Sequence, residues 1–139
     1  MLKSVAIFPV CFLLGAVPIV LVGSPQAAAP AFKVPPEIAS QTNPAKSTPE
    51  SIAKAKKFWG YDCAMCHGAN GDGKGDMAVQ SKFVMKDYRD PDALKDLTDG
   101  ELFYIIDKGK GDNMPAEGDR QKPAEIWNMV ILVRSFGKK

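Results

Sequence analysis

The sequence predicts a small all-α domain, because three of its segments combine a helix-start signal with apolar residues at helical spacing. The first of these helices is expected from residue 47 or 48 to about residue 60, the second from 98 to about 108, and the third from 123 to 136. A fourth, shorter helix is expected over residues 91–97. With a total of 139 residues, the chain has room for one such domain of four or five helices.

The first helix has two overlapping start signals. Thr48 can cap it with Pro49 in the first helical position, and Ser47 with Glu50 offers a capping box that begins one residue earlier. Apolar residues then recur every three or four positions, which gives the helix one buried face. They are Ile52, Ala55 and Trp59.

The later helices carry the same kind of boundary signal. Thr98 and Glu101 form a capping box that opens the second helix, and Gly109 follows its end. Asp90 is the expected cap of the short helix that ends at residue 97. The last helix starts near Pro123 and is strongly apolar, with Trp127 available to pack on the first helix.

Residues 1–31 are expected to form a secretory signal peptide. They contain one charge, at Lys3, then an apolar run over residues 5–22 and a stretch of small residues. Cleavage after Ala31 satisfies the preference for small residues at the cut. An uncleaved N-terminal anchor is the alternative, because the apolar run is near the length that spans a membrane.

Residues 32–46 are predicted to be a proline-rich, extended linker. Pro35, Pro36 and Pro44 disfavour a helix and bias the residues before them toward extended conformations. The segment is expected to be a disordered leader or, alternatively, an arm that wraps the domain. The folded domain is then expected over residues 47–139.

The most specific motif is Cys63-Ala64-Met65-Cys66-His67. This C-x-x-C-H spacing is the signature of covalent haem attachment, in which two thiols add to the vinyl groups of one porphyrin and the imidazole reaches the iron. A structural zinc site needs four ligands, whereas His67 is the only histidine and the remaining cysteine lies in the N-terminal apolar run. A thioredoxin-like dithiol is disfavoured because a glycine-rich loop follows the motif.

From residue 47 to residue 136 the chain resembles class I monohaem c-type cytochromes. The resemblance rests on a helix before the attachment motif, the glycine-rich loop after it, the segment 97–104, the sequence Asn113-Met114-Pro115-Ala116, and a last apolar helix. It implies a class I cytochrome c-like fold around one haem c. In that fold Cys63 and Cys66 would hold the haem covalently.

The resemblance implies that His67 is the proximal iron ligand and Met114 the distal one. The residues themselves favour Met114, because a thioether in a polar, glycine-rich loop gains little from its surroundings unless it binds something. Met85 is the rival, and an open sixth site is the remaining alternative. Related cytochromes use a backbone carbonyl to orient the proximal histidine, but this chain has Gly75-Asp76 where they often have Gly-Pro, so the residue that supplies the carbonyl is undetermined.

These observations predict an exported, periplasmic one-electron carrier with a His/Met-ligated haem c, and not an enzyme. The expected partners are redox proteins such as a dehydrogenase, oxidase or reductase complex, with the protein acting as a monomer or as a subunit. The alternatives are a haem-based sensor or peroxidase-like protein with a displaceable sixth ligand, or the electron-transfer subunit of a larger oxidoreductase. Any membrane contact would be through an uncleaved anchor.

The charge pattern excludes a nucleic-acid partner. The formal net charge is only +2, which is too weak for nonspecific nucleic-acid binding. Residues 87–119 hold ten acidic and four basic side chains, whereas residues 120–139 hold one acidic and five basic ones. Such a dipolar distribution can orient a redox partner or serve solubility alone.

Overall fold

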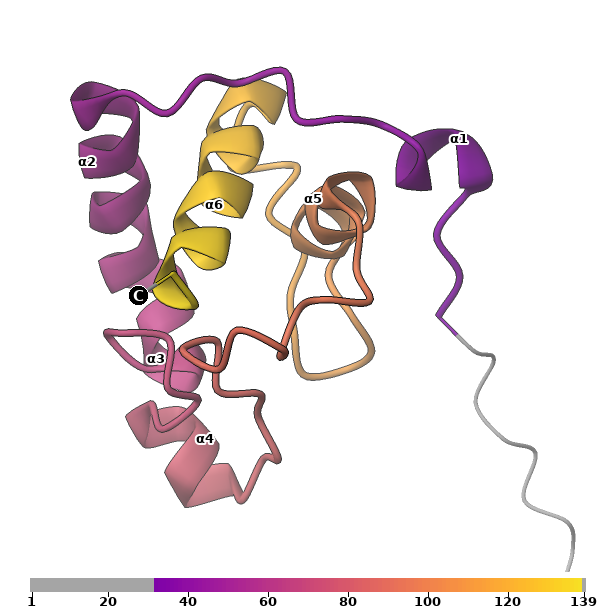
Figure 1. The fold of residues 1–139 in the computed structure, drawn as a ribbon. Coiled ribbons are helices and arrows are strands. Elements are labelled where there is room, and N and C mark those ends of the chain that lie inside the picture. Colours follow the sequence, from indigo (N-terminus) through magenta and orange to yellow (C-terminus); the bar gives the residue numbers. More distant parts are fainter. Residues whose placement is uncertain (1–31, 139) are drawn as a thin grey trace, which may run out of the picture. The chain divides into compact units, whose positions relative to one another are not determined.

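The computed structural model describes residues 32–138, which form helices joined by loops (Figure 1). These residues contain no strand, only an isolated bridge between Lys110 and Met114. The all-α prediction is confirmed, with four helices of six residues or more. The elements are α1 (Pro36–Ala39), α2 (Pro49–Phe58), the π-helical turn η1 (Trp59–Cys63), α3 (Ala64–His67), α4 (Asp76–Ser81), α5 (Asp99–Lys108) and α6 (Pro123–Phe136).

The elements α2, η1 and α3 follow one another without a break and carry the chain from Pro49 to His67. Thr48 caps α2 as predicted, and its hydroxyl accepts a hydrogen bond from the Ser51 N–H at 3.1 Å. Ser51, not Glu50, closes the capping box, so the alternative start at Ser47 is wrong. The π-turn widens the helix by one residue per turn, a distortion often found at functional sites.

The core lies where α6 crosses α2 on one side and packs against α5 on the other (Figure 1). The contribution of α2 and η1 is Ala55 and Trp59, which are 3% and 4% exposed. The small side chain of Ala55 allows the two helices to approach closely. The buried side chains of α6 are Ile126, Trp127, Met129, Val130, Leu132 and Val133.

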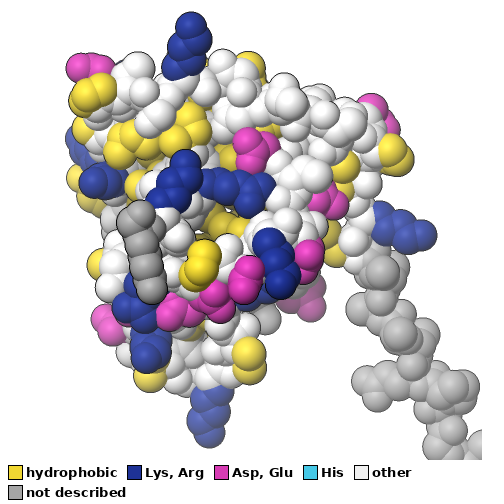
Figure 2. Space-filling model, in the orientation of Figure 1, with side chains coloured by type: hydrophobic (Ala, Val, Ile, Leu, Met, Phe, Trp, Pro, Cys, Tyr) yellow, Lys and Arg dark blue, Asp and Glu magenta, His cyan; other side chains and the backbone are white. Residues whose placement is uncertain are grey.

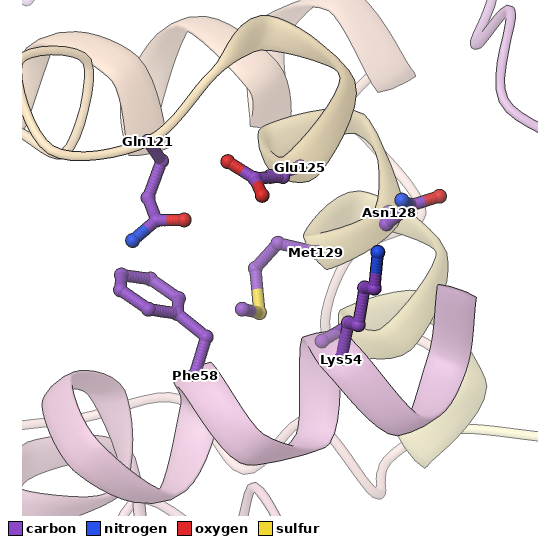
Figure 3. A pocket seen from close by; sticks show the side chains of 7 residues that line it. Lys54, Phe58, Gln121, Glu125, Asn128 and Met129 are labelled. Atoms are coloured by element: carbon purple, nitrogen blue, oxygen red, sulfur yellow. The ribbon is translucent and has the colours of Figure 1, made fainter. Parts of the chain in front are cut away.

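A small cavity of about 40 Å³ remains between α2 and α6. Figure 3 shows Lys54 and Phe58 of α2 on one side, and Glu125 and Met129 of α6 on the other. A space of this size has room for water molecules only. It is therefore a packing defect at the helix crossing, without the volume that a porphyrin needs.

The helix α5 forms as predicted. Its capping box joins Thr98 and Glu101, and Gly109 follows its last residue with φ +74°. Trp127 of α6 makes a contact that was not expected. Its ring stacks on Phe103 of α5 with the centroids 4.3 Å apart, so Trp127 joins α6 to α5.

The short helix predicted over residues 91–97 is wrong, because this segment forms successive turns. The predicted cap does form, since the Asp92 N–H donates to the Asp90 carboxylate at 2.9 Å. The N–H groups of Ala93, Lys95 and Leu97 each donate to the carbonyl three residues back, so the segment makes successive turns and not an α-helix. Arg134 of α6 donates to the carbonyl oxygens of Leu94 and Leu97 and holds the end of the segment.

The segment over residues 32–46 is not uniformly extended, because α1 forms within it with Pro36 in its first position. It is also held on the helical domain. The Thr98 hydroxyl donates to the Ala39 carbonyl at 2.7 Å, and the Asn43 side-chain amide donates to the Trp127 carbonyl at 2.9 Å. The segment therefore matches the arm alternative and not the disordered leader. The start of the functional domain at residue 47 stays a prediction.

The predicted signal peptide lies outside the described residues, and so does the anchor alternative. None of the helices over residues 32–138 has the length and apolar character that crossing a membrane requires. The helix α4 was not predicted either: it occupies part of a stretch with mixed sequence character, and Lys82 follows its end in the left-handed region, with φ 56°.

Substituting Gly100 tests the packing of the arm on α5. A Cβ at this position would collide with the backbone carbonyl of Ile38, which cannot move without displacing α1. Gly100→Ala should therefore lower the free energy of unfolding, although alanine in a helix ordinarily raises it by up to about 1 kcal/mol. Faster trypsin cleavage at Lys46 in the haem-loaded protein would report the release of the arm.

Gly60→Ala is the matched control, since a Cβ there meets nothing within 4 Å. It should leave both stability and cleavage at Lys46 unchanged or slightly improved. If Gly100→Ala behaved in the same way, the packing of α1 on α5 would be contradicted.

Candidate functional site

The two motif cysteines lie on one helical turn. Cys63 is the last residue of η1, and Cys66 lies in α3 directly before His67. Residues three apart on a helix share a face, so the two thiols project to the same side. Both cysteines are free and half-buried. The spacing in the sequence thus places the two thiols next to each other on one helical face.

The glycine-rich loop folds back onto this turn. The Gly73 N–H donates to the His67 carbonyl at 2.8 Å, and the Gly75 N–H donates to the Cys66 carbonyl at 3.2 Å. A Cβ at Gly75 would collide with the carbonyl oxygens of Ala64 and Met65. The loop needs glycine there because its backbone lies directly against the attachment turn.

Two aromatic rings hold the imidazole of His67. The Tyr88 ring stacks on it at 5.3 Å between centroids and 22° between planes, and the Trp59 ring lies 5.7 Å away. Burial lowers the pKa of His67 and so favours the neutral imidazole, which is the form that binds metals. Its Nδ1 atom is buried with no hydrogen-bond partner among the described residues, so the expected orienting carbonyl is absent there.

Trp59 connects this site to the core. Its indole N–H donates to the carbonyl of Gly68 at 3.0 Å, directly after the motif. Its ring packs on Phe136 of α6 with the centroids 5.0 Å apart. The sequence identifies Trp59 as a core residue through its spacing, but nothing local predicts its contacts with His67 and Gly68.

Met114 lies in the loop between α5 and α6. The Lys110 N–H donates to the Met114 carbonyl at 2.9 Å and closes a tight turn after Gly109. Met114 is half-buried and packs against the buried core cluster. Cys63 and Tyr88, which lie earlier in the sequence, pack against the same cluster. The structure therefore brings the predicted distal ligand and the attachment turn to one core.

The other methionines are differently placed. Met65 and Met77 are 48% and 43% exposed, whereas Met129 is 2% exposed within α6. Met85 packs beside Gly73, in the loop that folds back on the attachment turn.

An ion cluster that the sequence analysis did not predict lies next to Cys63. Arg120 donates to the carboxylate of Asp62 at 3.1 Å and to that of Glu117 at 2.5 Å. Burial raises the pKa of the Cys63 thiol to about 12, and the negative charges of Glu117 and Asp62 act in the same direction. Burial also raises the pKa of Glu117, against the opposing effect of Arg120.

A cavity of about 440 Å³ lies beside the attachment turn, between the end of α2 and the end of α6. It borders none of the four residues that the sequence predicts to bind haem, so it is not assigned to the cofactor. Its lining residues are Lys56, Trp59, Gly60, Ala64, Ala69, Asn70, Leu132 and Phe136.

Residues 50–133 match the protein family described as cytochrome C oxidase, cbb3-type, subunit III. The matched range contains the attachment turn, the glycine-rich loop and the Met114 loop. The chain belongs to this family of c-type cytochromes. Family membership means that the protein carries covalently bound haem c with its iron, and that its role is haem-based electron transfer.

A curated relative is the cbb3-type cytochrome c oxidase subunit FixP of Azorhizobium caulinodans, which is 30% identical over 93 residues. The match takes in 60% of this chain but only 27% of that protein. This cytochrome therefore spans about a quarter of the length of its curated relative.

Two solved structures share the fold. One is the KustC0563 c-type cytochrome, with a TM-score of 0.53, 21% identity, and coverage of 60% of this chain and 98% of that one. The other belongs to the Kuenenia stuttgartiensis reducing HAO-like protein complex Kustc0457/Kustc0458, with a TM-score of 0.56, 22% identity, and coverage of 67% and 46%. At these identities the likeness concerns the fold, which is that of a c-type cytochrome.

The described residues fit the haem that the family carries. The two free thiols share a helical face, and the buried imidazole beside them is held in its neutral form by desolvation. The glycine-rich loop lies so close to the turn at Gly75 that a Cβ there would meet the carbonyl oxygens of Ala64 and Met65. The assignment of each residue to a role toward the haem stays a prediction.

Replacing Trp59 with phenylalanine tests its link to the attachment turn. The Gly68 carbonyl would lose its donor while remaining buried, which costs about 1–3 kcal/mol in addition to the lost ring volume. Guanidinium unfolding of the haem-loaded protein, followed by circular dichroism, measures the effect.

Trp127→Phe is the matched control. Trp127 is similarly buried, at 6% exposed against 4% for Trp59, and its indole makes no hydrogen bond within the described part of the chain. We expect Trp59→Phe to cost about 1 kcal/mol more than Trp127→Phe. Equal losses would show that the indole hydrogen bond contributes nothing.

Proposed function

We propose that this cytochrome is an exported one-electron carrier whose haem is fixed by Cys63 and Cys66 and whose iron is bound by His67 and Met114. The observation that carries the proposal is that the attachment turn and the Met114 loop pack against one buried cluster. The haem supplies an iron that changes oxidation state by one electron. The protein supplies its burial, its orientation and its axial ligands.

The proximal side is supported by the packing of His67. Tyr88 and Trp59 restrict the imidazole plane, and the helical backbone fixes its position relative to the two thiols. Desolvation keeps the ring neutral, so a nitrogen lone pair is available to the iron at neutral pH. These residues hold and orient the ligand without taking part in proton transfer.

The distal assignment to Met114 is supported by the positions of the alternatives. Met65 and Met77 face solvent, and Met129 is enclosed in the core. Met85 packs beside Gly73, whose N–H donates to the His67 carbonyl. Met114 is half-buried on a loop that is closed by backbone hydrogen bonds, which suits a ligand held in one position. Pro115, directly after it, restricts the loop further.

Two closed axial positions favour electron transfer over catalysis. An iron that keeps both ligands exchanges an electron without binding a substrate, and a thioether favours the reduced iron. A sensor or peroxidase-like protein would need an open or displaceable sixth site. It would also need an acid–base pair beside that site, and the chain has no second histidine for this. The protein therefore acts as a carrier and not as an enzyme.

Redox proteins are the partners in this proposal. The cytochrome would transfer electrons to them either as a free carrier or as a subunit of a redox complex. The subunit form is favoured by the family description and by the relative FixP, which is named as an oxidase subunit. Figure 2 shows acidic and basic side chains close together on one face, without a large patch of one sign. A partner would then be oriented by local pairs and by the weak overall dipole. Co-purification with a membrane oxidase or dehydrogenase would distinguish the subunit from the free carrier.

The distal ligand is tested by absorption spectra of the haem-loaded protein in both oxidation states. The ferric protein should be low-spin with the weak far-red band of a sulfur ligand. Met114→Ala should lose that band, lower the reduction potential and allow the ferrous protein to bind carbon monoxide, because the sixth site opens. Met85→Ala is the control and should keep the band. The reverse pattern would assign the ligand to Met85, and a high-spin wild type would favour the sensor or peroxidase alternative.

The attachment is tested by removing both thiols. The Cys63→Ala, Cys66→Ala double variant, expressed with haem-ligation machinery, should lose its haem under denaturing electrophoresis because no thioether forms. The single variants should each keep one bond and stain for haem more weakly. Haem that stayed with the denatured double variant would refute the assignment.

A further inference from the structure

The loop that carries Met114 is fastened at its base to α5. The Glu117 N–H donates to the Ile106 carbonyl at 3.0 Å, and the Gly118 N–H donates to the Asp107 carbonyl, also at 3.0 Å. Together with the Lys110–Met114 bridge, these bonds close the loop on itself and on one helix. None of them reaches the attachment turn.

Arg120 makes the connection between the two parts of the site. Its guanidinium binds Glu117, three residues after Met114, and also Asp62, the residue directly before Cys63. Asp62 and Arg120 are 58 residues apart in sequence. The arginine side chain therefore spans from the distal loop to the attachment turn.

The burial of Glu117 makes this cluster different from an ordinary surface ion pair. The Glu117 side chain is 7% exposed, whereas those of Asp62 and Arg120 are 30% and 50% exposed. A buried carboxylate that loses its counter-charge is strongly unfavourable, because it keeps the desolvation cost without the attraction. One oxygen, Oε2, already lacks a partner, so Arg120 is its main compensation.

We propose that Arg120, held between Asp62 and Glu117, is a positioning residue that keeps the Met114 loop closed over the haem. Glu117 is the buried end of this clamp, and Asp62 ties it to the turn that carries Cys63. Removing Arg120 leaves Glu117 buried without a counter-charge, and the loop can relieve this by opening toward water. An open loop takes Met114 away from the iron.

This inference rests on the proposed distal role of Met114, and the test has one readout that depends on that role and one that does not. The first readout is the affinity of the ferric haem-loaded protein for imidazole, which competes with the methionine and so reports loop opening. The second is hydrogen exchange of the Glu117 and Gly118 amides, which reports loop opening whatever binds the iron.

In Arg120→Gln we expect imidazole to bind on the order of tenfold more tightly, with correspondingly faster exchange at both amides. Arg120→Lys should resemble Arg120→Gln in both imidazole affinity and amide exchange, because an ammonium group lacks the planar fork of donors that binds two carboxylates. Asp62→Asn should give the same effect at about a third of the size, since Asp62 is itself more exposed than Glu117, at 30% against 7%. Arg89→Gln is the control, because it removes an exposed pair with Asp87 within one loop.

A double variant separates positioning from general destabilisation. Glu117→Gln removes the buried charge, so Arg120→Gln should raise imidazole affinity much less in that background than in the wild type. Equal effects in both backgrounds would overturn the clamp. So would faster amide exchange with unchanged imidazole affinity in a protein that shows the far-red band, because the cluster would then be structural only.

The proposed function can fail separately. If the wild type lacks the far-red band, Met114 is not the ligand, and the role of the clamp in iron ligation falls with it. The amide exchange then decides whether Arg120 closes the loop at all. Unchanged exchange in Arg120→Gln would overturn that part as well.

Discussion

The structure depends on the burial of Trp59 at the point where the first helical run meets α6. The indole is 4% exposed and contacts Phe136, Tyr88 and His67 with its ring, while its N–H is bound to the carbonyl of Gly68. One side chain thus joins the core, the attachment turn and the first residue of the glycine loop. The same residue begins the π-turn that ends at Cys63. The position of the thiols is therefore set by core packing as well as by helix geometry.

The parts of the fold that the sequence predicted are those decided locally. The caps at Thr48 and Thr98, the stop at Gly109 and the proline start of α6 all depend on residues within one turn of the helix end. The parts that could not be predicted depend on distant residues. Arg134 of α6 binds the carbonyl groups of Leu94 and Leu97 where a helix was predicted, and hydrogen bonds at Thr98 and Trp127 hold the arm.

The same division applies to the site. The sequence predicts the thiols and His67 as haem-binding residues because they are contiguous, and Met114 because a methionine is unusual in a polar, glycine-rich loop; these roles stay predictions. The contact of Tyr88 with His67 had no local signal, since the stretch around Tyr88 lacks clear periodicity. The cluster of Asp62, Glu117 and Arg120 was hidden as well, because three charged residues in a chain rich in charge suggest solvation until the fold brings them together.

These contacts make the two sides of the proposed haem site unequal in stability. On the side of His67, the ligand belongs to a continuous helical run that the buried Trp59 anchors in the core, and covalent attachment would add to its stability. On the side of Met114, the ligand sits on a loop held by a few backbone hydrogen bonds and by an ion cluster whose arginine is half exposed. Local opening begins where few apolar contacts must be broken, so the distal loop is the part that opens first. An electron carrier of this kind needs the loop to stay closed during electron exchange. The ion cluster of Glu117 and Arg120 therefore has a functional role beyond any contribution to the overall stability of the fold.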